Sequence, residues 1–90
     1  MNDYTEIESL DLLIKAVGDY QAELDVNRQI LTNAANLCDA AMGSDDIAKK
    51  HIQNLNNALA KLAATSQLAA SVAEALVEDK KRAWRAYYGE

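Results

Sequence analysis

The sequence predicts an all-α fold, an antiparallel two-helix hairpin that assembles into a four-helix bundle. The 90-residue chain contains no proline, and the polar break Gly43-Ser44-Asp45-Asp46 separates two long stretches. In both stretches apolar residues recur at alternating steps of three and four, which is typical of helices packed along a seam. We expect a single domain over residues 1–90.

The first helix is predicted over about residues 5–42. It can start at Asp3 or at Thr5, and Thr5 with Glu8 fits a capping box. Gly18 lies within the repeat and costs about 1 kcal/mol relative to alanine. Because the repeat keeps its register there, we expect a continuous or slightly bent helix, with a break at Gly18-Asp19 as the alternative. The predicted seam positions are Leu10, Leu13, Val17, Tyr20, Leu24, Asn27, Leu31, Ala34, Cys38 and Ala41.

A turn is predicted at 43–45 and the second helix at about 46–87. Gly43 can adopt the left-handed conformation that ends helices, and Ser44 is a suitable N-cap. So short a connection makes the two helices antiparallel neighbours. The second set of seam positions is Ala48, Ile52, Leu55, Leu59, Leu62, Ser66, Ala69, Ala73, Leu76, Lys80, Ala83 and Tyr87.

The charge pattern agrees with antiparallel pairing, because it brings opposite charges together at the open end of the hairpin. The acidic group there is Asp3, Glu6, Glu8 and Asp11, and the basic group is Lys80, Lys81, Arg82 and Arg85.

The apolar stripe is wider than a two-helix seam requires, and a chain of this length has a marginal core unless it associates. We therefore expect association with a second copy or with another helical hairpin. The residues predicted to form this association face are Ile14, Ile30, Leu37, Val72 and Val77.

The C-terminal aromatic residues allow two interpretations. Trp84, Tyr87 and Tyr88 with Arg85 have the residue types enriched in binding hot spots, which predicts a recognition site. Alternatively, the rings pack on Met1, Tyr4 and Ile7 and close the open end. Asn27 and Ser66 likewise either fix the register of a buried layer or lie at a solvated gap.

No pattern in the sequence indicates an enzyme, a cofactor site or a metal site. Cys38 and His51 could approach each other, but a thin hairpin offers neither a pocket nor a third orienting group. Asp19, Glu23 and Asp25 lack the Glu-x-x-His spacing of di-iron bundles, so a solvated acidic face is expected.

The net charge of −5 does not favour binding to nucleic acid. Up to Gly43 the chain has eight acidic residues and only two basic ones, Lys15 and Arg28. From Ser44 onward it has six acidic and seven basic residues. The sequence shows no signal peptide and no membrane span. We expect a cytoplasmic protein, and export without a cleaved signal peptide stays open.

Taken together, these features resemble the W-x-G superfamily of small type VII secretion substrates. The hairpin signature of that family falls on Ala41-Met42-Gly43, where Gly43 matches and alanine stands at the tryptophan position. The resemblance implies a leaderless helical hairpin that forms homo- or heterodimeric four-helix bundles. It also implies an adaptor that escorts a larger toxin. From their residue types, and not from the resemblance, we expect Trp84, Arg85, Tyr87 and Tyr88 to contact the secretion machinery or cargo.

We therefore expect a non-enzymatic protein-binding module, an adaptor, chaperone or co-secreted partner in a type VII-like system. One alternative is a small acidic phage-type inhibitor that binds a basic site on a host or defence protein, which the acidic first helix favours. Another is an enzyme subunit whose site a partner completes, which would require Cys38 or His51 to affect activity.

Overall fold

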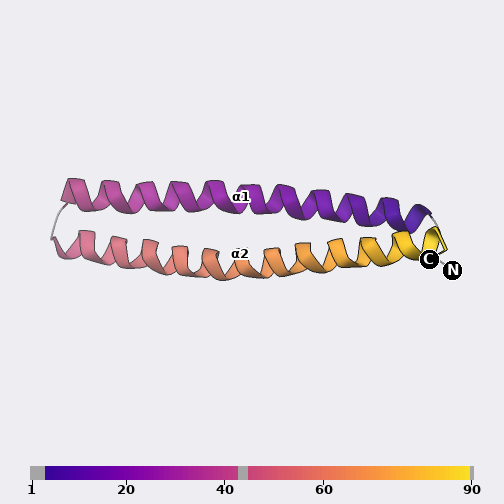
Figure 1. Cartoon of the computed structure of the whole chain (residues 1–90). Coiled ribbons are helices and arrows are strands. Elements are labelled where there is room, and N and C mark those ends of the chain that lie inside the picture. The colour runs from indigo at the N-terminus through magenta and orange to yellow at the C-terminus, as the bar shows by residue number, and fades with distance from the viewer. Residues whose placement is uncertain (1–3, 43–44, 90) are drawn as a thin grey trace. The chain divides into compact units, whose positions relative to one another are not determined.

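The chain folds into two α-helices that pack against each other as an all-α hairpin, as predicted. The computed structural model describes residues 4–42 and 45–89, in which α1 is Tyr4–Met42 and α2 is Asp46–Tyr87 (Figure 1). The predicted bounds were 5–42 and 46–87. Gly43 and Ser44, at which the turn was predicted, lie outside the described residues.

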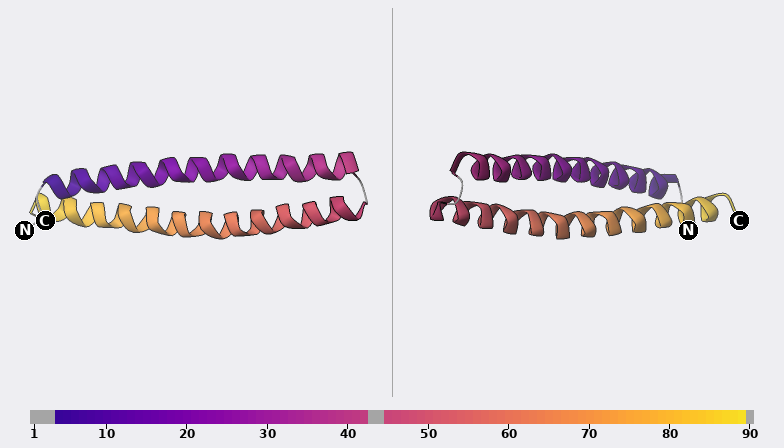
Figure 2. Two further views of the ribbon diagram at one scale, coloured as in Figure 1. Left: turned by 180° about the vertical axis from the view of Figure 1, so that it is seen from behind. Right: turned by 60° about the vertical axis from the view of Figure 1, so that its left-hand side comes forward.

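The two helices divide into two compact units. Unit 1 joins Met1–Gln21 to Gln67–Glu90, and unit 2 is Ala22–Ser66. In each unit a segment of α1 runs beside a segment of α2, as the two views in Figure 2 show. The prediction of a single domain over residues 1–90 stays a prediction.

Helix α1 continues through Gly18 and Asp19, so the alternative of a helix break at this point was wrong. Gly18 is exposed, and a Cβ atom added there would meet no atom within 4 Å. Because nothing approaches Gly18 closely, the packing of unit 1 does not require a glycine at this position.

The first turn of α2 is capped by Asp45. Its Oδ1 accepts a hydrogen bond from the backbone N–H of Ile47 at 2.8 Å, and its carbonyl oxygen accepts one from Lys49 at 3.0 Å. This is the pattern of an N-cap residue, whose side chain satisfies an N–H group that lacks a partner in the helix. The predicted N-cap, Ser44, lies outside the described residues, and the cap function belongs to Asp45.

The other helix ends also differ in detail from the prediction. Thr5 lies inside α1, which begins at Tyr4, so Thr5 is not the N-cap of a capping box. At the end of α2, Gly89 has a φ of 75°, the left-handed conformation that commonly follows a helix.

The predicted seam of α2 is confirmed from Ala48 to Ala83. Every predicted position in that range is buried or half-buried, whereas Tyr87 is exposed. Lys80 fits this pattern because its stem is shielded while its amino group reaches Asp11 of α1.

The predicted seam of α1 was wrong at Leu13, Tyr20, Asn27 and Ala41. Leu13 and Tyr20 are 51% and 47% exposed, and Asn27 and Ala41 are also exposed. The structure instead places neighbouring residues in the seam. The buried or half-buried positions up to the middle of α1 are Ile7, Leu10, Ile14, Val17, Gln21 and Leu24.

The physical reason for this shift is that α1 is apolar on more than one side. Leu12, Leu13 and Ile14 are consecutive, so more than one stripe satisfies the three-four repeat. Helix α2 is the more amphipathic of the two, so its pattern identifies one inward face. Ile7, which is almost fully buried, begins the correct stripe of α1.

Few side chains within the described residues are fully shielded from solvent. The buried apolar residues are Ile7, Leu24, Ala48, Ala69 and Ala83. Three of these five are alanines, which contribute little apolar area when buried. The hairpin therefore has a thin core, and much of its apolar surface remains exposed.

Candidate protein interface

One side of unit 1 is closed by contacts between the helices, and we call it the closed flank. The ring of Tyr4 lies edge-on to Trp84 at 6.3 Å and to Tyr87 at 5.6 Å between ring centroids. Seven residues further along α1, Asp11 forms an ion pair with Lys80. Residues seven apart lie on the same side of a helix, so these contacts mark one side of the seam.

The predicted charge pairing at the open end is therefore confirmed for Asp11 and Lys80. The neighbouring bases pair within α2 instead: Lys81 with Glu78 at 3.3 Å, and Arg82 with Asp79 at 3.6 Å. All four of these side chains are at least half exposed, so such pairs contribute little to stability. Asp3, which was also predicted to take part, lies outside the described residues.

The other side of unit 1 exposes apolar side chains from both helices. Successive residues advance by about 100° around a helix, which places Leu13 and Tyr20 across the seam from Tyr4 and Asp11. On α2 the same rule places Val72 across the seam from Trp84. We call this surface the apolar flank; its exposed members are Leu13, Ala16, Tyr20, Leu68, Val72 and Ala75.

The residues of the predicted association face lie on different sides of the seam. Val72 is half exposed and lies on the apolar flank. Val77 lies seven residues before Trp84, on the closed flank, and is 40% exposed. Ile14 is half-buried in the seam, where it packs toward α2 rather than outward. Val72, Val77 and Ile14 therefore do not form one continuous surface.

Unit 2 has exposed apolar residues of its own. Ile30 and Leu37, both predicted association residues, are well exposed, as are Val26 on the same helix and Ile47 on α2. The seam of unit 2 includes Cys38, whose thiol approaches the Ala48 carbonyl oxygen at 3.7 Å. Cys38 is thus a partly buried packing residue.

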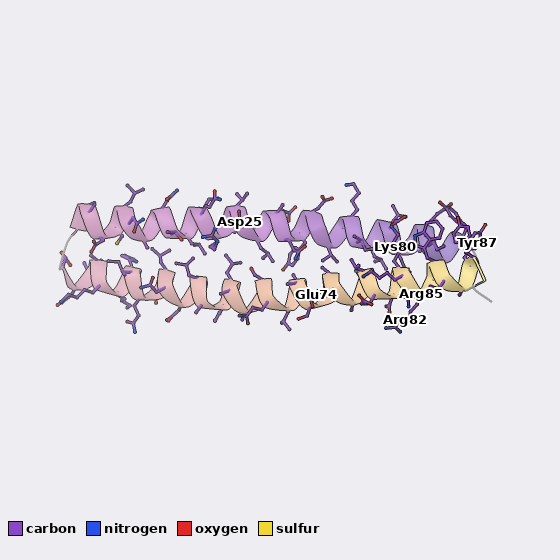
Figure 3. All side chains as sticks on the ribbon, in the orientation of Figure 1. Asp25, Glu74, Lys80, Arg82, Arg85 and Tyr87 are labelled. Carbon is purple, nitrogen blue, oxygen red and sulfur yellow. The ribbon has the colours of Figure 1, made fainter. Side chains whose placement is uncertain are left out.

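Two of the aromatic residues at the end of the chain, Trp84 and Tyr87, contact Tyr4 of α1. This agrees in part with the second interpretation of the sequence, in which the rings close the open end of the hairpin. Trp84 is half-buried, and Tyr88 stacks on it at 4.6 Å between ring centroids with 28° between the planes. Tyr88 directly follows α2, and its ring contacts those of Trp84 and Tyr87 at the end of that helix. Figure 3 shows Arg85 and Tyr87 at this end of the helix, beside the rings. Met1 lies outside the described residues.

The structure does not bring the remaining candidate residues into a chemical site. His51 is exposed on α2. Over residues 4–42 and 45–89, no three side chains of His, Cys, Asp or Glu are placed to hold a metal ion together. Two surface hollows each lie on a single helix; one is lined by Ala22, Glu23, Val26 and Asn27, the other by Ala73, Glu74, Val77 and Glu78.

Asn27, the polar residue predicted either to fix the register or to lie at a solvated gap, is exposed, whereas Ser66 is half-buried in the α2 seam. Neither helix, over the part of the chain that the structure describes, has a stretch apolar enough to cross a bilayer.

The sequence interpretation missed three of the largest residues of the apolar flank. Leu13 and Tyr20 were assigned to the seam, and Leu68, which is 69% exposed, was not singled out. One signal could have found the two that lie on α1. A repeat that starts at Ile7 runs through Leu10 and Ile14, and it leaves Leu13 and Tyr20 outside.

Comparison of this chain with family models, curated proteins and solved structures finds no match.

Proposed function

We propose that this chain is a non-enzymatic protein-binding module that pairs with a helical hairpin partner. One observation carries the proposal: large apolar side chains, Leu13, Tyr20 and Leu68 among them, remain exposed outside the seam. Exposed apolar residues that are grouped on one side of a helix pair mark association surfaces. Pairing would add to a core that the chain alone supplies thinly.

The biological role we propose is that of an adaptor, chaperone or co-secreted partner in a type VII-like system. The support for this role is the resemblance of the sequence, with Gly43 at the position of the family's hairpin signature, to the W-x-G superfamily. In such a role the exposed faces would bind another hairpin, and Trp84, Arg85, Tyr87 and Tyr88 would contact cargo or a secretion component. Deleting the protein from its host should then reduce export of a partner toxin; unchanged export would contradict the adaptor role.

A second candidate is an acidic inhibitor of a basic site on a host or defence protein. The observation that favours it is the charge of α1, where Lys15 and Arg28 are already paired with Asp19 and Asp25. Other carboxylates of α1, such as Glu23 and Asp39, are exposed and would face a basic target. This candidate would bind through charge rather than through apolar area.

Salt dependence separates the two candidates. Association through apolar side chains should change little between about 0.05 and 0.5 M NaCl, because the screening length falls without affecting apolar burial. Binding of an acidic face to a basic target should weaken strongly over the same range. Light scattering of the purified chain at several concentrations, at both salt levels, measures self-association through apolar side chains directly.

A further inference from the structure

We infer that α1 of unit 1 has two rotational registers against α2, and that the contacts of Tyr4 and Asp11 lock it in the observed one. In the second register, Leu13 and Tyr20 lie in the seam and Ile14 moves to its edge. The lock therefore decides whether the large α1 residues of the apolar flank are exposed. This inference does not depend on which partner, if any, binds that flank.

The two registers share half of their seam residues. Residues that recur every seven positions form a column along a helix, and a seam contains two columns. Leu10 and Val17, both half-buried, belong to a column that fits either register. The other column is Ile7, Ile14 and Gln21 in the observed register, and Leu13 and Tyr20 in the second. Because adjacent residues lie about 100° apart, exchanging these columns at the edges of the seam needs a rotation of about 50°.

The two exchangeable columns are similar in apolar content. Within unit 1 each contributes two large apolar side chains, Ile7 and Ile14 in one register and Leu13 and Tyr20 in the other. The observed column buries Ile7 almost completely, but it also holds Gln21, whose amide loses water where it is half-buried. The balance between the columns is therefore small enough for contacts outside the seam to decide it.

The α2 side of the seam resists rotation only weakly. Three of its positions in unit 1, Ala69, Ala73 and Ala83, carry no more than a methyl group. Such short side chains form shallow ridges, which oppose a small rotation of the facing helix less than long side chains do. In unit 2 both columns of α1 are already shielded: Ala34 and Ala35, one from each repeat, are half-buried.

The contacts of the closed flank hold α1 in the observed register. The ring of Tyr4 contacts those of Trp84 and Tyr87, and Asp11 forms an ion pair with Lys80. Tyr4 and Asp11 lie at the edge of the seam away from the apolar flank. A rotation that brings the apolar flank of α1 inward therefore carries both residues away from α2. The two ring contacts and the ion pair must break together.

A disulfide within one chain measures the register at the level of Leu76. The contacts of the closed flank place Leu76 at the level of residues 12–15. Two chains, Ile14→Cys/Leu76→Cys and Leu13→Cys/Leu76→Cys, both in a Cys38→Ser background, are equilibrated in a glutathione buffer. A disulfide requires Cβ atoms about 4 Å apart. We expect the disulfide of the Ile14→Cys chain to be the more stable one.

A second layer distinguishes rotation from fraying. The same contacts place Ala69 at the level of residues 19–22. Gln21→Cys and Tyr20→Cys, each combined with Ala69→Cys in the same background, therefore repeat the comparison seven residues further along α1. Rotation about the helix axis changes the preference in both layers together, whereas fraying from the open end changes the outer layer alone.

Tyr4→Ala combined with Asp11→Asn removes the lock. We expect the preference for the observed column to fall at least about fivefold in both layers, because two ring pairs and one ion pair no longer oppose rotation. Tyr88→Ala combined with Asp79→Asn is the matched control. It removes one ring and one carboxylate whose partners belong to α2, and it should leave both preferences near wild type.

Circular dichroism establishes that the lock variant and the control remain helical. Asp11→Asn alone keeps all the rings and should shift both layers in the same direction by a smaller factor, which tests the inference should the double variant unfold. An unchanged preference, an equal change in the control, or a change confined to the outer layer would overturn the inference. Each of these results leaves the proposed function intact, because association through exposed apolar side chains does not require a second register.

Discussion

The ring of Tyr4 in the first turn of α1 lies edge-on to the ring of Tyr87 in the last turn of α2, with 5.6 Å between centroids and 61° between the planes. Tyr4 also contacts Trp84, so one side chain joins the beginning of one helix to the end of the other. This contact holds together helix ends that would otherwise fray.

Replacing Tyr4 should therefore loosen this end of unit 1. We expect Tyr4→Ala to lower the free energy of unfolding by about 1–3 kcal/mol, because two aromatic pairs are lost together with apolar contact area. Urea denaturation followed by Trp84 fluorescence measures the change. Tyr88→Ala is the control, since Tyr88 directly follows α2 and pairs with two rings of that helix, and it should cost less. Equal losses for the two variants would contradict a bridging role for Tyr4.

Gly18 is a position where substitution should stabilise the protein. Gly18→Ala should raise the free energy of unfolding by about 1 kcal/mol, because alanine restricts the unfolded chain and is the better helix former. The added Cβ atom would meet nothing within 4 Å. Gly89→Ala should act in the opposite direction, because Gly89 has a φ of 75° that alanine rarely adopts. Thermal melts of the two variants at one protein concentration provide the comparison.

The cap at Asp45 should contribute measurably to the stability of α2. Asp45→Ala is expected to cost about 1 kcal/mol, because the Ile47 N–H loses its side-chain acceptor at 2.8 Å. Asp45→Asn keeps an oxygen in place and should restore most of that loss. If Asp45→Asn were as unstable as Asp45→Ala in urea melts, the hydrogen bond would not be the source of the effect.

Among the described residues of unit 2, Leu24 is the largest buried side chain, and its truncation should be severe for so thin a core. We expect Leu24→Ala to cost about 2–5 kcal/mol, from lost burial and the cavity that remains. Leu37→Ala removes the same atoms from an exposed position of α1 and should cost much less stability. Because dimerisation would make melting depend on concentration, both variants are compared with wild type at equal concentrations. Similar costs for the two would show that the seam of α1 is placed incorrectly.

Local features of the sequence determined the helical fold and most of the helix boundaries. The absence of proline and the polar break at Gly43-Ser44 limit the chain to two long helices. The seam of α2 followed from the sequence because α2 is apolar mainly on one side. The ion pair of Asp11 with Lys80 followed in turn from antiparallel pairing, which brings the first turns of α1 beside the last turns of α2.

Only the tertiary structure decided which stripe of α1 faces α2. Leu13 and Ile14 are adjacent and similar in hydrophobicity, so the sequence fits either one in the seam; packing against α2 turns Ile14 inward and leaves Leu13 exposed. That choice leaves Leu13 and Tyr20 exposed on the same side of the seam as Val72 and thereby defines the apolar flank. The periodicity of one helix specifies that an inward face exists, but the side chains of the opposing helix determine which face it is.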